Sequence, residues 1–180
     1  KVKDKINHNQ LIFTNHIFDF YRILIEGNKI PTSSVVLDKN IINEVGHFNE
    51  NVNLITAEDF ELWLRVLNYG YKANLIPKSL GYIREHTTNS SSNIDKSLNA
   101  AIFAVKSVLN SIKVSAKKGK ELKRKSIALI YYSNSINLLK KGSIINFFLF
   151  FKQAIKYDPL IPFSYVFKMV SLLSLKIKKF

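Results

Sequence analysis

The clearest pattern of apolar and polar positions lies between residues 57 and 69. Its apolar side chains recur at the spacing of one helical face: Phe60, Trp63, Leu64 and Leu67. Thr56, followed three residues later by Asp59, has the spacing of a helix-capping signature, and Gly70 follows the last apolar position. The pattern therefore predicts a helix over about this range.

Two short segments after this helix have the pattern of strands. Residues 71–76, with the sequence YKANLI, end at Pro77, and proline commonly stops a strand. Residues 81–84, with the sequence GYIR, form the second segment, and the polar loop 89–93 follows. The sequence thus predicts a helix, a strand, a turn and a strand in that order.

The apolar pattern becomes helical from residue 94 onward. The first stripe comprises six side chains: Leu98, Ile102, Val105, Val108, Leu109 and Ile112. A basic run at residues 117–125 interrupts the pattern, and further helices are predicted at about 122–139, 144–156 and 162–178. None of these segments is continuously apolar over the roughly 20 residues that a membrane-spanning helix needs.

Charge is distributed unevenly between the two halves of the chain. Residues 1–94 carry 10 basic and 10 acidic side chains, whereas residues 95–180 carry 17 basic and 3 acidic ones, which gives the net charge of +14. This change falls close to the polar loop after residue 88 and predicts a domain boundary there. The chain is 47% hydrophobic, which is enough for a core, and it has no cysteine, which excludes disulfides and thiolate metal sites.

Acidic residues open the predicted helix at 57–69. Glu58, Asp59 and Glu61 lie in its first turn, where the positive end of the helix dipole favours negative side chains. This helix-end role explains the acids without any catalysis. The motifs around them support a second interpretation.

These motifs follow one another in a fixed order. They are an acidic pair, a Leu-Trp-Leu-Arg helix, a Gly-Tyr-Lys turn, an Ile-Pro and a Tyr-x-Arg-x-His ending, found at 58–59, 62–65, 70–72, 76–77 and 82–86, with Asn89 and Ser91 behind them. The segments 27–36 and 45–48 agree with the run that leads into the acidic pair. From residue 18 to 92 the chain thus resembles the back half of the catalytic domain of family 2 glycosyltransferases.

The resemblance implies an α/β fold class followed by an all-α region. Residues 1–93 are expected to form the acceptor-side half of a GT-A, Rossmann-like domain, and residues 94–180 a basic helical extension. The front half of such a domain binds the nucleotide, and each of its βαβ units needs about 30 residues or more. Only 17 residues precede Phe18, and no Asp-x-Asp metal motif occurs. We therefore expect a C-terminal piece of a longer enzyme that does not transfer sugar by itself.

The resemblance also implies catalytic roles for the acidic pair. Asp59 is expected to be the general base that takes the proton from an acceptor hydroxyl as this hydroxyl attacks the anomeric carbon of a nucleotide sugar. Glu58 is expected to orient the site or the acceptor. The alternative for both is an ordinary acid in the first turn of a helix.

Three more residues are candidates for contact with the substrate. Trp63 has a ring that sugars stack on, but it lies on the same apolar stripe as Phe60, and we favour a place in the core. Ser33 and Ser34 would line the cleft, although two serines before Val35 are also ordinary turn residues.

Arg84 and His86 stand where the family binds the nucleotide diphosphate. The planar guanidinium of Arg84 suits phosphate because it forms paired hydrogen bonds. His86 would complete the shell of a divalent metal, Mn or Mg, or donate a hydrogen bond to phosphate. The alternative is a loop histidine with neither role, which is the more common case. The resemblance implies this metal cofactor, although the Asp-x-Asp ligands are absent from the chain.

The predicted function is sugar transfer from a nucleotide sugar to a glycan or lipid-linked acceptor in bacterial surface polysaccharide synthesis, with inversion. The implied location is the cytoplasm, at the inner face of the plasma membrane, with peripheral membrane contact through the basic helices. One alternative is a noncatalytic membrane-docking or scaffold module. Another is a basic nucleic-acid-binding protein, which we do not expect because the aromatic residues lie on apolar stripes and do not alternate with lysine and arginine.

Overall fold

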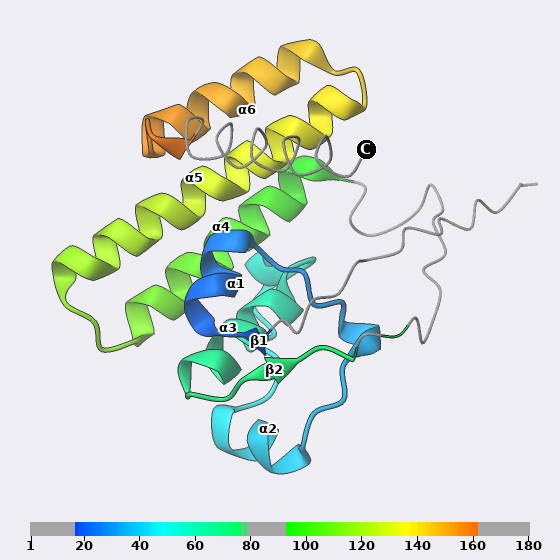
Figure 1. Cartoon of the computed structure of the whole chain (residues 1–180), viewed down its shortest axis with the longest axis vertical. Helices are drawn as coiled ribbons and strands as arrows, with labels where there is room; N and C mark the ends of the chain where they lie inside the picture. Colours follow the sequence, from blue (N-terminus) through cyan, green and yellow to red (C-terminus); the bar gives the residue numbers. More distant parts are fainter. Residues whose placement is uncertain (1–16, 77, 79–92, 162–180) are drawn as a thin grey trace, which may run out of the picture. The chain divides into compact units, whose positions relative to one another are not determined.

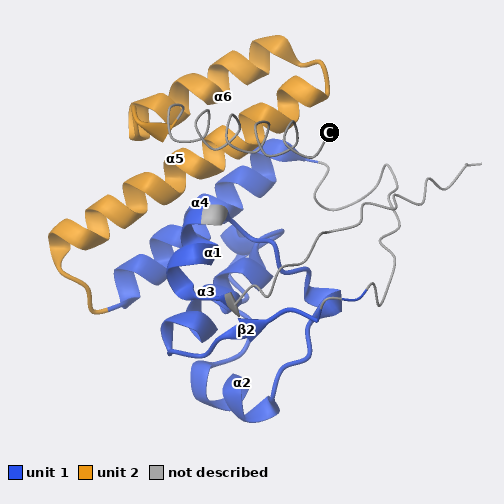
Figure 2. Ribbon diagram, viewed as in Figure 1, with its two compact units in different colours: residues 1–112 blue, residues 113–180 orange. Residues whose placement is uncertain are grey.

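The computed structural model describes residues 17–76, 78 and 93–161, and this part of the chain is mostly helical (Figure 1). The chain divides into two compact units, unit 1 with residues 1–112 and unit 2 with residues 113–180 (Figure 2). The boundary predicted from charge, after residue 93, assigned the helix at 94–111 to the basic half. In the structure this helix belongs to unit 1.

The elements of unit 1 follow one another as short helices with one strand pair. In chain order they are β1 (Ile17–Phe18), α1 (Phe20–Glu26), η1 (Thr32–Ser34), α2 (Lys39–Val45), η2 (Val52–Leu54), α3 (Glu58–Asn68), β2 (Ala73–Asn74) and α4 (Ile94–Ser111). Unit 2 contributes α5 (Ala116–Lys140) and α6 (Ile144–Tyr157).

The predicted α/β fold class is wrong. The strands in the described residues are β1 and β2, which are two residues long each and pair antiparallel, Ile17 with Asn74 and Phe18 with Ala73. A Rossmann-like domain needs a parallel sheet of several strands covered by helices. Of the predicted strand 71–76 only β2 forms, and the predicted strand 81–84 lies outside the described residues. The apolar residues of unit 1 instead meet through helical faces.

Helix α3 is the centre of unit 1, and its predicted extent is confirmed within one residue at each end. Its core-facing positions are almost completely buried: Phe60, Leu62, Trp63, Leu64, Val66 and Leu67. Contacts join this helix to α1, α2 and α4. Gly70 follows it with a φ of 100°, a left-handed conformation that glycine adopts without steric strain.

The predicted cap of α3 is wrong in detail. The N-cap residue is Ala57, whose side chain forms no capping hydrogen bond. Thr56 precedes it with a φ of 85°, which is rare for a β-branched residue. Its backbone N–H donates to Oε2 of Glu58 at 2.8 Å. The acid that closes this turn is therefore Glu58, and Thr56 itself accepts no helix N–H.

Arg65 of α3 joins this helix to the end of α2. Its guanidinium forms a paired contact with Glu61, with Nε to Oε1 at 2.9 Å and Nη2 to Oε2 at 2.9 Å. It also donates to three backbone carbonyls that follow or end α2: Val45 at 2.8 Å, Gly46 at 3.1 Å and His47 at 2.7 Å. The last carbonyls of a helix lack partners within the helix, so Arg65 satisfies groups that α2 cannot satisfy itself. Glu61 is only 3% exposed, and Arg65 compensates its charge.

Tyr71 ties the segment after α3 to α2. Its hydroxyl donates to Oε2 of Glu44. This hydrogen bond, followed by partial burial and the charges of Glu44 and Asp38, raises the pKa of the phenol above its ordinary value of 10.0.

We expect the contribution of the Tyr71–Glu44 hydrogen bond to stability to decrease at alkaline pH. Because the folded-state pKa is raised, the contribution is fully present below the ordinary value of 10.0 and is lost as pH rises through the folded-state pKa. The tyrosinate absorbance that Tyr71→Phe removes should titrate at higher pH in the wild type than in Glu44→Gln. Equal titration in both proteins would show that Glu44 does not hold the phenol in solution.

Unit 2 is a helical hairpin. Helices α5 and α6 lie side by side and are joined through Gly142, whose φ is 78° (Figure 1). Its core contains Ala128, Leu129, Tyr132, Ala154 and Ile161, with partly buried aromatic rings around them. The basic run at 117–125 does not interrupt the helix as predicted, because α5 begins at Ala116, where Ser115 caps it by accepting from Lys118 N. The predicted helix 162–178 lies outside the described residues.

An ion pair closes the end of this hairpin. Nη1 of Arg124 on α5 lies 3.2 Å from Oδ1 of Asp158 and donates to the carbonyl of Tyr157 at 3.1 Å. Asp158, directly after α6, is 4% exposed, and its carboxylate also accepts from Leu160 N at 3.2 Å. This contact fastens the C-terminal end of α6 to the first half of α5.

Candidate functional site

The carboxylate of Asp59 lies in the first turn of α3 and meets a loop from earlier in the chain. Thr32 Oγ1 donates to Oδ2 of Asp59 at 2.8 Å, and Asn28 Nδ2 donates to Oδ1 at 3.1 Å. Asn28 lies in the loop after α1, and Thr32 is the first residue of η1, so both partners come from the segment between α1 and α2. The structure thus brings Asp59 together with two polar side chains that precede it by 31 and 27 residues in the sequence.

Trp63 fixes this loop one helical turn further along α3. Its indole Nε1–H donates to the carbonyl of Ile30 at 3.2 Å, and the backbone N–H of Ile30 donates to Oδ1 of Asn28 at 3.1 Å. Residues four apart lie on the same side of a helix, so Asp59 and Trp63 hold the loop together. Trp63 is 6% exposed, which leaves its ring little surface for a sugar and favours the core position.

In the part of the chain that the structure describes, the groups that donate hydrogen bonds to the Asp59 carboxylate are uncharged. Asn28 and Thr32 are neutral donors, and the backbone N–H of Phe60 donates to Oδ1 at 2.6 Å. The N-terminal end of α3 interacts favourably with a negative side chain. Among the described residues, the hydrogen bonds to Asp59 thus come from neutral donors.

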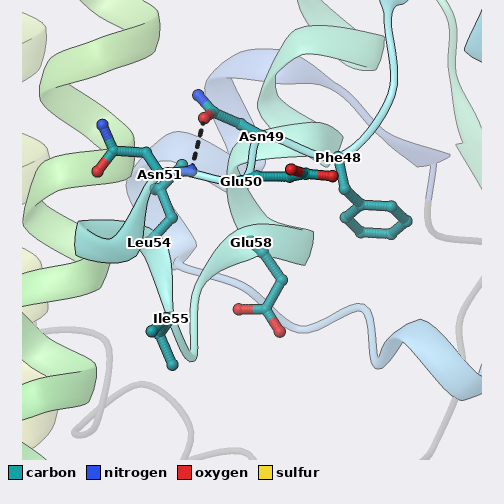
Figure 3. A pocket seen from close by; sticks show the side chains of 7 residues that line it. All are labelled: Phe48, Asn49, Glu50, Asn51, Leu54, Ile55 and Glu58. Carbon is teal, nitrogen blue, oxygen red and sulfur yellow. Dashed lines mark hydrogen bonds between the residues drawn. The ribbon is translucent and has the colours of Figure 1, made fainter.

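Glu58 has different surroundings from Asp59. It accepts from the backbone of Thr56, and it lies in the wall of a pocket of about 270 Å³ (Figure 3). The pocket is lined by Phe48, Asn49, Glu50, Asn51, Leu54, Ile55 and Glu58, and Asn51 N donates to Asn49 Oδ1 at 3.1 Å within it. The two acids thus do not converge on one point, and the described contacts give Glu58 a part in shaping the turn.

The remaining predicted site residues fall into two groups. Ser33 and Ser34 are exposed in η1, and Ser34 Oγ donates to the carbonyl of Pro31 at 2.8 Å, which agrees with ordinary turn chemistry. Arg84 and His86 lie outside the described residues. Within the residues that the structure describes, no group of three His, Cys, Asp or Glu side chains could hold a metal ion, so the Mn or Mg site stays a prediction.

Sequence reasoning did not assign a role to Asn28 or Thr32. Both belong to the segment 27–36, which is one of the ordered motifs. Membership of this segment is the only sign in the sequence that they lie near Asp59. Their hydrogen bonds to Asp59 span 31 and 27 residues. No helical or strand periodicity encodes a contact at such a separation.

Comparison with known proteins found no matching family model, no matching curated protein and no matching solved structure. Together with the helical fold, this result makes the predicted membership of family 2 glycosyltransferases with a GT-A fold wrong. The motif order on which it was based consists of short local patterns, and short patterns recur in unrelated folds.

Proposed function

We propose that unit 1 binds a hydroxyl-bearing acceptor at Asp59 and that this carboxylate acts as the general base for transfer of a sugar to it. The observation that carries the proposal is the contact between Thr32 Oγ1 and Asp59 Oδ2. Its length of 2.8 Å lies in the range over which a base accepts a proton from a hydroxyl. This geometry supports a base that acts on a hydroxyl. The choice of a sugar as the transferred group follows the order of the motifs in residues 18–92.

The acceptor hydroxyl would take the place of Thr32. Thr32 and Asn28 are exposed and come from a loop, so a ligand can approach the carboxylate from that side. Asp59 then takes the hydroxyl proton, the freed oxygen bonds to the anomeric carbon of the donor, and the bond to the nucleotide diphosphate breaks with its electron pair. Asn28 can hold one carboxylate oxygen in place while the other accepts the proton. The groups that bind the donor are expected outside the described residues.

Replacing Asp59 by asparagine in the full-length native protein is expected to lower kcat with a panel of nucleotide sugars by about 10²–10⁴-fold. Asparagine keeps the shape and the hydrogen bond from Asn28 but cannot take a proton. The melting temperature should stay close to that of the wild type. Steady-state kinetics would measure kcat and KM separately.

A matched control is Asp19→Asn, which changes another acid at a helix N-terminus. Asp19 caps α1 by accepting from Arg22 N at 2.8 Å, and asparagine caps helices equally well. Turnover should be unchanged in this variant. If Asp59→Asn also leaves turnover unchanged, Asp59 has no part in the chemistry.

A further inference from the structure

Helix α6 exposes apolar side chains on the face turned away from α5. Ile145 is 78% exposed, Phe148 61% and Leu149 57%, and Ile144 beside them is exposed as well. Their spacing in the sequence puts all four on one side of the first two turns of α6. Isolated apolar residues are common on surfaces, but a contiguous group of this kind marks an interaction site.

The opposite face of α6 packs against α5. Ala154 is fully buried, and the rings of Phe147 and Phe151 stack at 5.3 Å between centroids, with Tyr132 of α5 at 6.2 Å from Phe151. The packing of the hairpin therefore does not need the exposed group. This second apolar face requires a separate explanation.

Basic residues border the exposed apolar group. Lys152 and Lys156 continue the same side of α6 at helical spacing. Lys140 ends α5 and Lys141 follows it, and all four lysines are exposed. No acidic residue occurs between Lys140 and Tyr157. We call the set Ile144, Ile145, Phe148, Leu149, Lys152 and Lys156 the α6 outer face. Its first half is apolar and its second half is basic.

We propose that the α6 outer face docks unit 2 on an anionic membrane surface, with α6 lying in the plane of the interface. Apolar side chains enter the boundary between headgroups and acyl chains, and lysines meet the anionic headgroups. Helix α6 has 14 residues, fewer than the roughly 20 that cross a bilayer, and no helix in the described part of the chain is long and apolar enough to do so. This docking site is separate from Asp59 and does not depend on the proposed transfer reaction.

Vesicle binding tests the proposal with the 180-residue chain. The protein should sediment with vesicles of equimolar phosphatidylcholine and phosphatidylglycerol, bind more weakly to phosphatidylcholine alone, and dissociate as salt is raised. Ile145→Asp should weaken binding by on the order of tenfold or more, because it puts a charge at the most exposed apolar position. Lys152→Gln with Lys156→Gln should weaken it about 25-fold, at about fivefold for each lysine.

Two controls separate docking from other causes. Val36→Asp changes a fully exposed apolar residue of unit 1 and should leave vesicle binding intact. The wild type emits from Trp63 alone. Phe148→Trp should add a second emission that shifts to the blue with anionic vesicles, and the difference from the wild type reports insertion of this side chain.

Three outcomes would overturn the proposal. One is full binding by Ile145→Asp together with loss in the lysine variant, which would mean electrostatic attraction without insertion. Another is equal binding to neutral and anionic vesicles. The third is absence of vesicle binding together with a dimer that Ile145→Asp dissociates, which would assign the α6 outer face to a second copy of the chain.

Discussion

Replacement of Arg65 by alanine is expected to lower the free energy of unfolding of unit 1 by about 3–5 kcal/mol. The variant leaves the charge of Glu61 buried without its partner, and it removes the donor to three carbonyls at the end of α2. Breaking a buried pair from one side has a large effect because the remaining charge keeps its desolvation penalty. Urea unfolding followed by tryptophan emission would measure this change in unit 1, since Trp63 is the only tryptophan.

Two further variants separate the causes of this loss. Arg65→Lys keeps the charge but loses the paired geometry, so it should recover only part of the stability. Arg65→Ala combined with Glu61→Leu removes both charges and should be more stable than Arg65→Ala alone, with the carbonyl contacts still missing. A loss below about 1 kcal/mol in Arg65→Ala would mean that the pair behaves as an exposed one.

Replacement of Arg124 by alanine is expected to destabilise the α5–α6 hairpin by about 2–4 kcal/mol. Asp158 is buried and would keep Leu160 N as its described partner. The effect should be smaller than that of Arg65 because Arg124 is 44% exposed, and solvent screens part of the interaction. Urea unfolding followed by far-ultraviolet circular dichroism would measure it.

The adjacent residue provides the matched control. Lys125 pairs with Glu121 at 2.6 Å, but both side chains are well exposed. The hydrogen bond from Lys125, followed by its charge, lowers the pKa of Glu121. Lys125→Ala should change stability little, since an exposed pair contributes little in solvent. Equal effects of Arg124→Ala and Lys125→Ala would show that Asp158 does not need its partner.

Helices with apolar residues along one face can be predicted from the sequence. The secondary structure of short apolar runs cannot. Helix α3 was found because its apolar positions follow one face and Gly70 ends it. The pattern of residues 71–76 predicts a strand, of which only β2 forms, and a six-residue run is too short for its periodicity to distinguish a strand from a helix. The start of α5 was placed too late because its basic residues carry no apolar pattern, although lysine is a good helix former.

The candidate site was predictable only in part. Asp59 was identified because two adjacent acids at a helix start are visible in the sequence. Its partners Asn28 and Thr32 are brought to it by the path of the loop between α1 and α2, which depends on tertiary contacts such as that between Trp63 and Ile30. The sequence predicts membrane contact through the basic helices but does not name the residues of the α6 outer face, because a helix that is apolar on both sides does not reveal which side its neighbour covers.

The left-handed backbone of Thr56 connects the positions of Glu58 and Asp59, the first two residues of α3. A β-branched residue reaches a φ of 85° only when surrounding contacts hold it there, and the bond from its N–H to Glu58 is one of them. Relaxation of this turn would reorient the first turn of α3, and with it the carboxylate of Asp59. Glu58 therefore holds the turn from which Asp59 projects, so a substitution at Glu58 would displace the carboxylate of Asp59 without contacting it.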